Sequence, residues 1–76
     1  MQTLPKIDVK ATGLNIQKLM KDNNISKREL QNTLGFSTPQ AIYKWVRGVN
    51  MPTLDNLVII ADVLNVTLDD IVVTEK

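Results

Sequence analysis

Apolar residues recur three or four positions apart along most of this 76-residue chain, which is the spacing of amphipathic helices. Ile16, Leu19 and Met20 form the stripe of a first helix, expected from about Thr12 to about Asn23. Similar stripes predict further helices over residues 26–34, 38–47, 53–64 and 67–72. The fourth is apolar almost all round, so we expect other helices to enclose it or one side to face a partner. The pattern predicts an all-α fold of five short helices.

Capping residues mark the start of several of these helices. Ser26 and Glu29 have the spacing of a capping box, in which each side chain accepts a hydrogen bond from the other residue's amide. Thr67 and Asp70 repeat that spacing at the fifth helix, and Thr53 can cap the fourth. The boundaries set by these caps agree with those set by the apolar spacing.

The chain ends differ from the helical part, which spans residues 12–72. Residues 1–11 contain Pro5 and show no sustained helical period, so we expect a flexible N-terminal arm. Residues 73–76 are expected to form a short C-terminal tail.

The second and third helices are expected to meet at a tight turn. Gly35 can close the second helix in a left-handed conformation. Ser37 or Thr38 can cap the third, with Pro39 in its first turn, where the missing amide hydrogen costs nothing. About three residues then separate the two helices. This is the helix-turn-helix pattern, whose second helix can enter the major groove of DNA.

The third helix has one buried side and one polar side. Ala41, Ile42, Trp45 and Val46 form the apolar side, and the aromatic ring of Trp45 is assigned to packing. The opposite side carries side chains suited to base edges, because Gln bonds bidentately to adenine, Arg or Lys to guanine, and a methyl or ring meets the thymine methyl. The predicted base-reading residues are Thr38, Gln40, Tyr43 and Lys44.

A second set of polar residues is suited to DNA phosphates. Lys44 and Arg47 lie farther along the third helix, and Ser26 and Lys27 open the second, where free amides favour an anion. Asn50 follows in the next loop. The alternatives are a solvated face for the lysines, a simple cap for Ser26 and a turn residue for Asn50.

Charge is unevenly distributed, although the formal net charge is only +1. Residues 18–50 hold six basic and two acidic residues, whereas residues 51–76 hold one basic and five acidic ones. The basic part contains the polar helix face, which favours a polyanion docking on that side.

Composition argues against several other classes. The chain has no Cys and no His, so it lacks thiolate and imidazole metal ligands and the commonest general base. Asp69 and Asp70 are expected to stabilise a helix start, not to bind a metal. We therefore predict no enzyme activity, no cofactor and no metal site. The chain lacks a signal-like or membrane-spanning apolar run, so we expect a soluble cytoplasmic protein.

Residues 12–72 resemble the phage-repressor and Cro-like helix-turn-helix family, also called the xenobiotic-response-element type. The matches are the Leu-Gly-Phe-Ser turn at residues 34–37, Trp45, Gly48, Pro52 and the Leu-Asn-Val-Thr-Leu-Asp run at residues 64–69. The resemblance implies a five-helix repressor-like fold, operator binding as a dimer and a role in transcriptional control.

The chain departs from the family pattern at several positions. Gln31 stands where a small residue is usual, and Lys27 where Gln is usual. Gly35 to Trp45 is one residue longer than the common spacing. Met20 and Val46 replace an Arg and a Glu that often pair, and we expect an apolar contact in their place.

The leading hypothesis is a sequence-specific transcriptional regulator, a repressor that binds a palindromic operator through its third helix. Two-fold pairing through the fourth and fifth helices would give a homodimer with half-sites about 34 Å apart. The alternative is a protein-binding module, such as an antitoxin or anti-regulator, that contacts another protein through its apolar C-terminal half.

Overall fold

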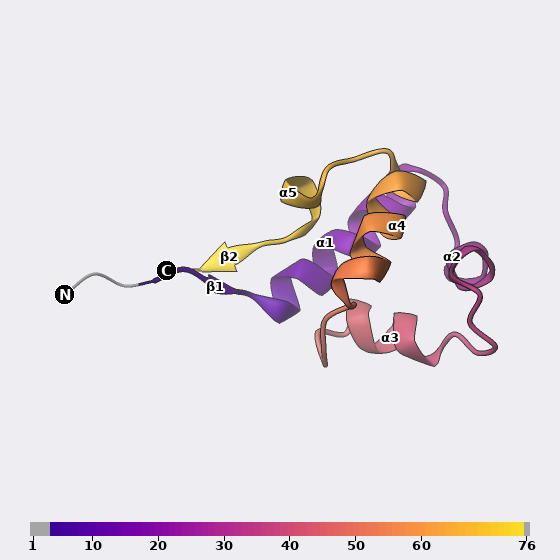
Figure 1. Ribbon diagram of the computed structural model, residues 1–76, viewed down its shortest axis with the longest axis horizontal. Coiled ribbons are helices and arrows are strands. Elements are labelled where there is room, and N and C mark those ends of the chain that lie inside the picture. Colours follow the sequence, from indigo (N-terminus) through magenta and orange to yellow (C-terminus); the bar gives the residue numbers. More distant parts are fainter. Residues whose placement is uncertain (1–3, 76) are drawn as a thin grey trace.

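The computed structural model describes residues 4–75, which fold into five helices and one pair of very short strands (Figure 1). The elements are β1 (Lys6–Ile7), α1 (Val9–Asp22), α2 (Lys27–Leu34), α3 (Gln40–Val46), α4 (Leu54–Leu64), α5 (Leu68–Ile71) and β2 (Thr74–Glu75). The two strands pair antiparallel, with Lys6 opposite Glu75 and Ile7 opposite Thr74. The predicted five-helix fold is confirmed.

The core lies where the apolar stripes of the helices converge. Trp45 is buried, and its ring meets that of Phe36 edge to face, with the centroids 5.8 Å apart and the planes at 65°. This contact ties α3 to the turn that follows α2 and confirms the packing role of Trp45. The buried apolar residues are Ile16, Met20, Leu30, Ile42, Trp45, Val46, Leu57, Ile60, Ala61, Leu64 and Ile71.

Helices α1 to α4 all end in the same way. Each is followed by a residue with positive φ, and these four residues are Asn24, Gly35, Gly48 and Asn65. The amide of the next residue, apolar in every case, donates to the carbonyl five positions back. These bonds run from Ile25 to Met20, Phe36 to Gln31, Val49 to Lys44 and Val66 to Ala61. This is the Schellman arrangement, and it turns the chain sharply between the helices.

Helix α3 begins later than the sequence indicated. The expectation that Ser37 or Thr38 caps it is wrong, because the first helical hydrogen bond runs from Tyr43 N to Pro39 O, 3.1 Å. Pro39 therefore holds the cap position, and it has no side-chain oxygen to offer. The turn spans residues 35–39 instead of about three residues, so the longer spacing before Trp45 is accommodated in the turn.

Helix α1 begins earlier than expected, at Val9 instead of about Thr12. Asp8 caps it, with a carboxylate oxygen that accepts from Ala11 N at 2.9 Å. Part of the segment expected to form an N-terminal arm thus lies in β1 and in the first turn of α1. Residues 1–3 and 76 lie outside the described residues.

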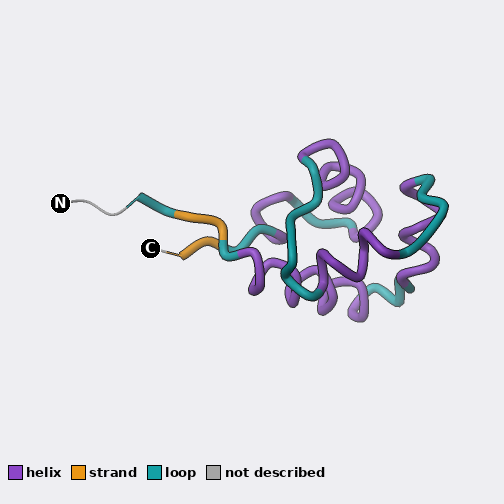
Figure 2. The backbone as a smooth tube through the Cα atoms, turned by 90° about the horizontal axis from the view of Figure 1, so that it is seen from below, coloured by secondary structure: helices purple, strands orange, loops and turns teal. Residues whose placement is uncertain are grey.

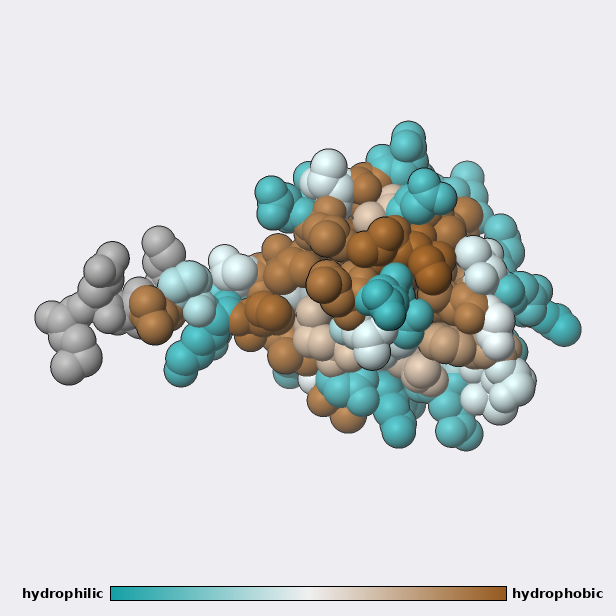
Figure 3. Space-filling model, in the orientation of Figure 1, coloured by the Kyte–Doolittle hydropathy of each residue, from teal (hydrophilic) through white to brown (hydrophobic). Residues whose placement is uncertain are grey.

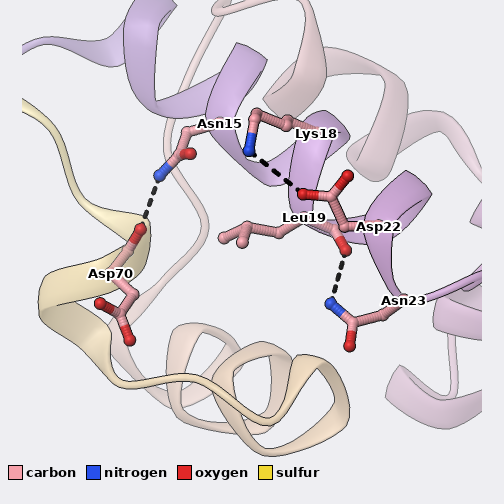
Figure 4. A network of polar contacts seen from close by, with 6 residues as sticks. All are labelled: Asn15, Lys18, Leu19, Asp22, Asn23 and Asp70. Atoms are coloured by element: carbon pink, nitrogen blue, oxygen red, sulfur yellow. Dashed lines mark hydrogen bonds and ion pairs between the residues drawn. The ribbon is translucent and has the colours of Figure 1, made fainter.

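The C-terminal segment is bound to α1 by polar contacts. Thr12 is fully buried, and its Oγ1 accepts from Val73 N at 3.0 Å. Asn15 Nδ2 donates to the carbonyl of Asp70 at 2.7 Å (Figure 4). It also donates to the carbonyl of Ile71 at 2.9 Å, and so satisfies the end of α5. The segments that carry β1 and β2 consequently leave the helices together, and the strand pair projects from the body (Figure 2).

The helices described here are all too short or too polar to cross a membrane.

Candidate nucleic-acid interface

The outer face of α3 brings four of the predicted residues together. Burial of Ile42, Trp45 and Val46 fixes the rotation of the helix, so the polar positions between them must face outward. All four outer residues are exposed, and they line a single shallow hollow of about 370 Å³. These residues are Gln40, Tyr43, Lys44 and Arg47.

The start of α2 carries two further predicted residues, Ser26 and Lys27. Ser26 Oγ accepts from Glu29 N at 3.0 Å, and Ser26 N donates to Glu29 Oε1 at 3.3 Å, which confirms the capping box. A hydroxyl that accepts in this way still has its own proton to donate. Ser26 can therefore cap α2 and bond an anion at the same time.

A second hollow, of about 400 Å³, lies between the start of α2 and one side of α1. Lys21 and Gln17 of α1 line it together with Ser26 and Lys27. Gln17 and Lys21 are not among the binding residues predicted from the sequence. Their spacing of four residues, outside the apolar stripe of α1, is the signal that could have identified them.

Lys27 joins the two hollows. Its Nζ lies 5.7 Å from the ring centroid of Tyr43, within the range of a cation–π interaction. Lys27 lines the hollow at α2, and Tyr43 lines the hollow on α3. The polar face of α3 and the start of α2 thus form one continuous surface, with the cations of Lys21, Lys27, Lys44 and Arg47 along it.

Thr38 and Asn50 lie outside these hollows. Thr38 is exposed in the turn before α3, and Asn50 is exposed in the loop that follows Gly48. Each flanks one end of the polar face of α3. Gln31, the long residue at a usually small position, folds onto the turn, where its Nε2 donates to Phe36 O at 3.2 Å.

Two glycines set how α3 lies against α1. A Cβ on Gly13 of α1 would overlap the carbonyl oxygen of Trp45, and a Cβ on Gly48 would lie 2.6 Å from the Cα of Lys10. The backbones therefore meet without intervening side chains at the C-terminal end of α3. This close approach holds the polar face of α3 in a fixed position on the domain.

A separate apolar surface lies on α4. Leu54, Val58 and Ile59 are 68%, 54% and 38% exposed, and an apolar area covers α4 in the space-filling view (Figure 3). The acidic residues Asp55 and Asp62 are exposed on the same helix. Other helices do not enclose α4 on all sides, because these three apolar residues are exposed. The exposures agree with the other expectation, that one side of this helix is open to a partner.

A helix-turn-helix with an exposed, cationic second helix is the arrangement of DNA-binding regulators. The helix-turn-helix family model HTH_3 matches residues 16–71, so the chain belongs to this family, whose members include the Cro and phage repressors. Membership in this family supports the function of a DNA-binding transcription regulator.

Two solved structures share the fold. The restriction-modification controller protein C.AhdI from Aeromonas hydrophila superposes with a TM-score of 0.74 at 19% identity, covering 84% of this chain and 96% of its own. The clp gene regulator ClgR from C. glutamicum gives a TM-score of 0.73 at 18% identity, covering 92% of this chain and 86% of its own. No curated protein matches the chain in sequence.

Proposed function

We propose that this protein is a sequence-specific repressor that binds a palindromic operator as a homodimer, with α3 in the major groove. The observation that carries the proposal is the continuous surface formed by the hollow on α3 and the start of α2, joined through Lys27 and Tyr43. Two solved proteins of the same fold are named as a controller protein and a gene regulator, which agrees with this function.

The proposed contacts divide by position. Thr38, Gln40, Tyr43 and Lys44 lie on or before α3 and read base edges, with Gln40 suited to adenine. The phosphate contacts are Ser26, Lys27, Lys44, Arg47 and Asn50. Lys44 has both roles, because its flexible stem can reach a base or the backbone.

The proposed dimer forms through α4 and α5. The exposed apolar residues of α4 are Leu54, Val58 and Ile59, and covering them in a two-fold contact removes apolar surface from water. Two copies related in this way can place their α3 helices in successive major grooves, about 34 Å apart.

A second candidate function rests on the same α4 surface. The alternative is that this chain is a protein-binding module, such as an antitoxin or anti-regulator. The apolar residues of α4 beside Asp55 and Asp62 would then receive a basic, apolar segment of another protein. In that case the protein partner binds at α4 and not at the surface on α3.

Salt dependence of binding separates the two functions. A regulator that neutralises several phosphates loses affinity for a DNA duplex steeply as salt rises, with a slope of about −0.9 per phosphate in a double-logarithmic plot. We expect a duplex-binding isotherm, measured by fluorescence anisotropy, to weaken in this way. Absence of duplex binding at low salt would instead favour the protein-binding module.

A further inference from the structure

Lys10 is a cation outside the residues that match the family model. It lies before residues 16–71, which match the family, and it is exposed in the first turn of α1. A positive charge at the N-terminus of a helix is repelled by the positive end of the helix dipole, which destabilises the helix. Helix stability therefore does not account for a lysine at this position.

Packing places Lys10 beside the loop that follows α3. A Cβ on Gly48 would lie 2.6, 3.1 and 3.2 Å from the Cα, Cβ and Cγ of Lys10, so the start of its side chain runs directly over the Gly48 backbone. Gly48 separates Arg47 from Val49 and Asn50. The first turn of α1 and the loop after α3 thus form one surface element.

The loop that follows α3 carries only positive charge. Residues 46–53 contain Arg47 and no acidic residue. Asp8, two residues before Lys10, is the nearest acid in the sequence, and its carboxylate accepts from Ala11 N at 2.9 Å as the cap of α1. Both cations, Lys10 and Arg47, are exposed.

We propose that Lys10, Arg47 and Asn50 form a phosphate-binding site beyond the C-terminal end of α3. Lys27 lies instead at Tyr43, within the helix. The two groups therefore flank the reading face at separate points, as contacts to the two backbones that border a major groove must do. This inference rests on the proposed function and adds to it a contact made by this chain's own N-terminal segment.

The test compares single charge removals in the full chain. Lys10→Gln keeps the Cβ and Cγ that cover Gly48 and removes the charge, and Lys10→Arg keeps the charge. Lys18→Gln is the matched control, because Lys18 lies on the same helix, pairs with Asp22 at 3.1 Å and lines neither hollow (Figure 4). Lys27→Gln tests the site at α2.

The readout is the salt slope of binding to a mixed-sequence duplex, together with the melting temperature. Lys10→Gln should make the slope shallower by about 0.9 and lower the affinity by about eightfold at about 0.1 M salt. Lys10→Arg and Lys18→Gln should bind like the wild type. The melting temperature of Lys10→Gln should equal or exceed that of the wild type, since the dipole penalty is removed.

Failure of this inference differs from failure of the proposed function. The site at Lys10 is disproved if Lys27→Gln makes the salt slope shallower and Lys10→Gln does not. It is also disproved if Lys18→Gln makes the slope as shallow as Lys10→Gln does. Neither result contradicts the proposed function as a DNA-binding regulator. A lower melting temperature for Lys10→Gln also counts against the site. If the wild type shows no salt-dependent duplex binding, both ideas fail.

Discussion

Met20 and Val46 are two apolar residues in the buried core of this protein. They are 4% and 7% exposed, on α1 and α3, and they stand where the family pattern that the sequence resembles implies an Arg and a Glu. Replacing a buried ion pair by two apolar side chains removes the cost of desolvating both charges, so the exchange is neutral or stabilising when both partners change. Restoring only one charge should be costly.

We predict that Val46→Glu destabilises the fold by roughly 3 kcal/mol, because it buries a carboxylate without a partner. Urea denaturation followed by circular dichroism measures the change. Adding Met20→Arg to Val46→Glu should recover part of the loss if the two positions face each other. An unfolding midpoint for Val46→Glu equal to that of the wild type would rule out the buried apolar contact.

The sequence was sufficient to predict which residues of α3 face outward, because the burial of Ile42, Trp45 and Val46 leaves only one orientation. It was not sufficient to predict that Lys27 lies over Tyr43, since that contact depends on the angle between α2 and α3. The start of α3 was also missed. Propensity favours a Ser or Thr cap, but here the longer turn puts Pro39 in the cap position.

At the scale of elements, the packing of α1 on α3 depends on Gly13. Helix propensity alone favours Ala over Gly by about 1 kcal/mol within a helix. A Cβ at this position would, however, overlap the backbone carbonyl of Trp45, which no rotamer change can relieve. Overpacking of this kind typically costs about 1 to 3 kcal/mol and more when backbone must move.

We therefore predict that Gly13→Ala lowers the free energy of unfolding by about 2 kcal/mol or more. Gly35→Ala is the comparison, because a Cβ there meets nothing within 4 Å and the cost comes only from φ of +74°. That cost is about 1 kcal/mol. A more stable Gly13→Ala variant in thermal unfolding would mean that the close approach of α1 and α3 is absent.

Helix α5 depends on its capping box, which also makes it sensitive to acid. Hydrogen bonds from the Thr67 amide and hydroxyl lower the pKa of Asp70 below its ordinary 3.8. Because the unfolded chain takes up the proton first as the pH falls, the contribution of Asp70 is complete above its unfolded pKa. It is lost as the pH falls through the lower, folded pKa.

The predicted result is that Asp70→Ala is less stable than the wild type at pH 7, with a smaller difference at about pH 3. Asp69→Ala is the control, since Asp69 is in the same helical turn but lies outside the capping box. The measurement is urea denaturation at both pH values. Equal losses for the two variants, or a loss independent of pH, would exclude the cap as the cause.

At the scale of the whole molecule, the contact between the N-terminal and C-terminal segments could not be predicted from the sequence. Thr12 and Val73 are 61 residues apart, and their contact leaves no periodic signal in the sequence. The strands comprise two residues each, too few for an alternating pattern. The helices could be predicted because their signals are local, whereas this contact depends on the completed fold.

The apolar surface of α4 leads to a prediction about assembly. If Leu54, Val58 and Ile59 form a two-fold contact, then Val58→Asp buries carboxylates there and should produce a monomer in sedimentation equilibrium at micromolar concentration. Leu14→Asp, at an exposed position of α1, should leave the oligomeric state unchanged. A Val58→Asp variant that remains dimeric would show that the dimer does not form through this surface of α4.

The central claim is that the outer face of α3 reads DNA sequence. Its most direct test is selection of bound duplexes from a random pool with the wild type and with Gln40→Ala. We predict an enriched palindrome with half-sites about one helical turn apart. Gln40→Ala should relax the preference at one base pair of each half-site, by roughly 1 to 3 kcal/mol. No enriched sequence, or the same preference in both proteins, would contradict the claim.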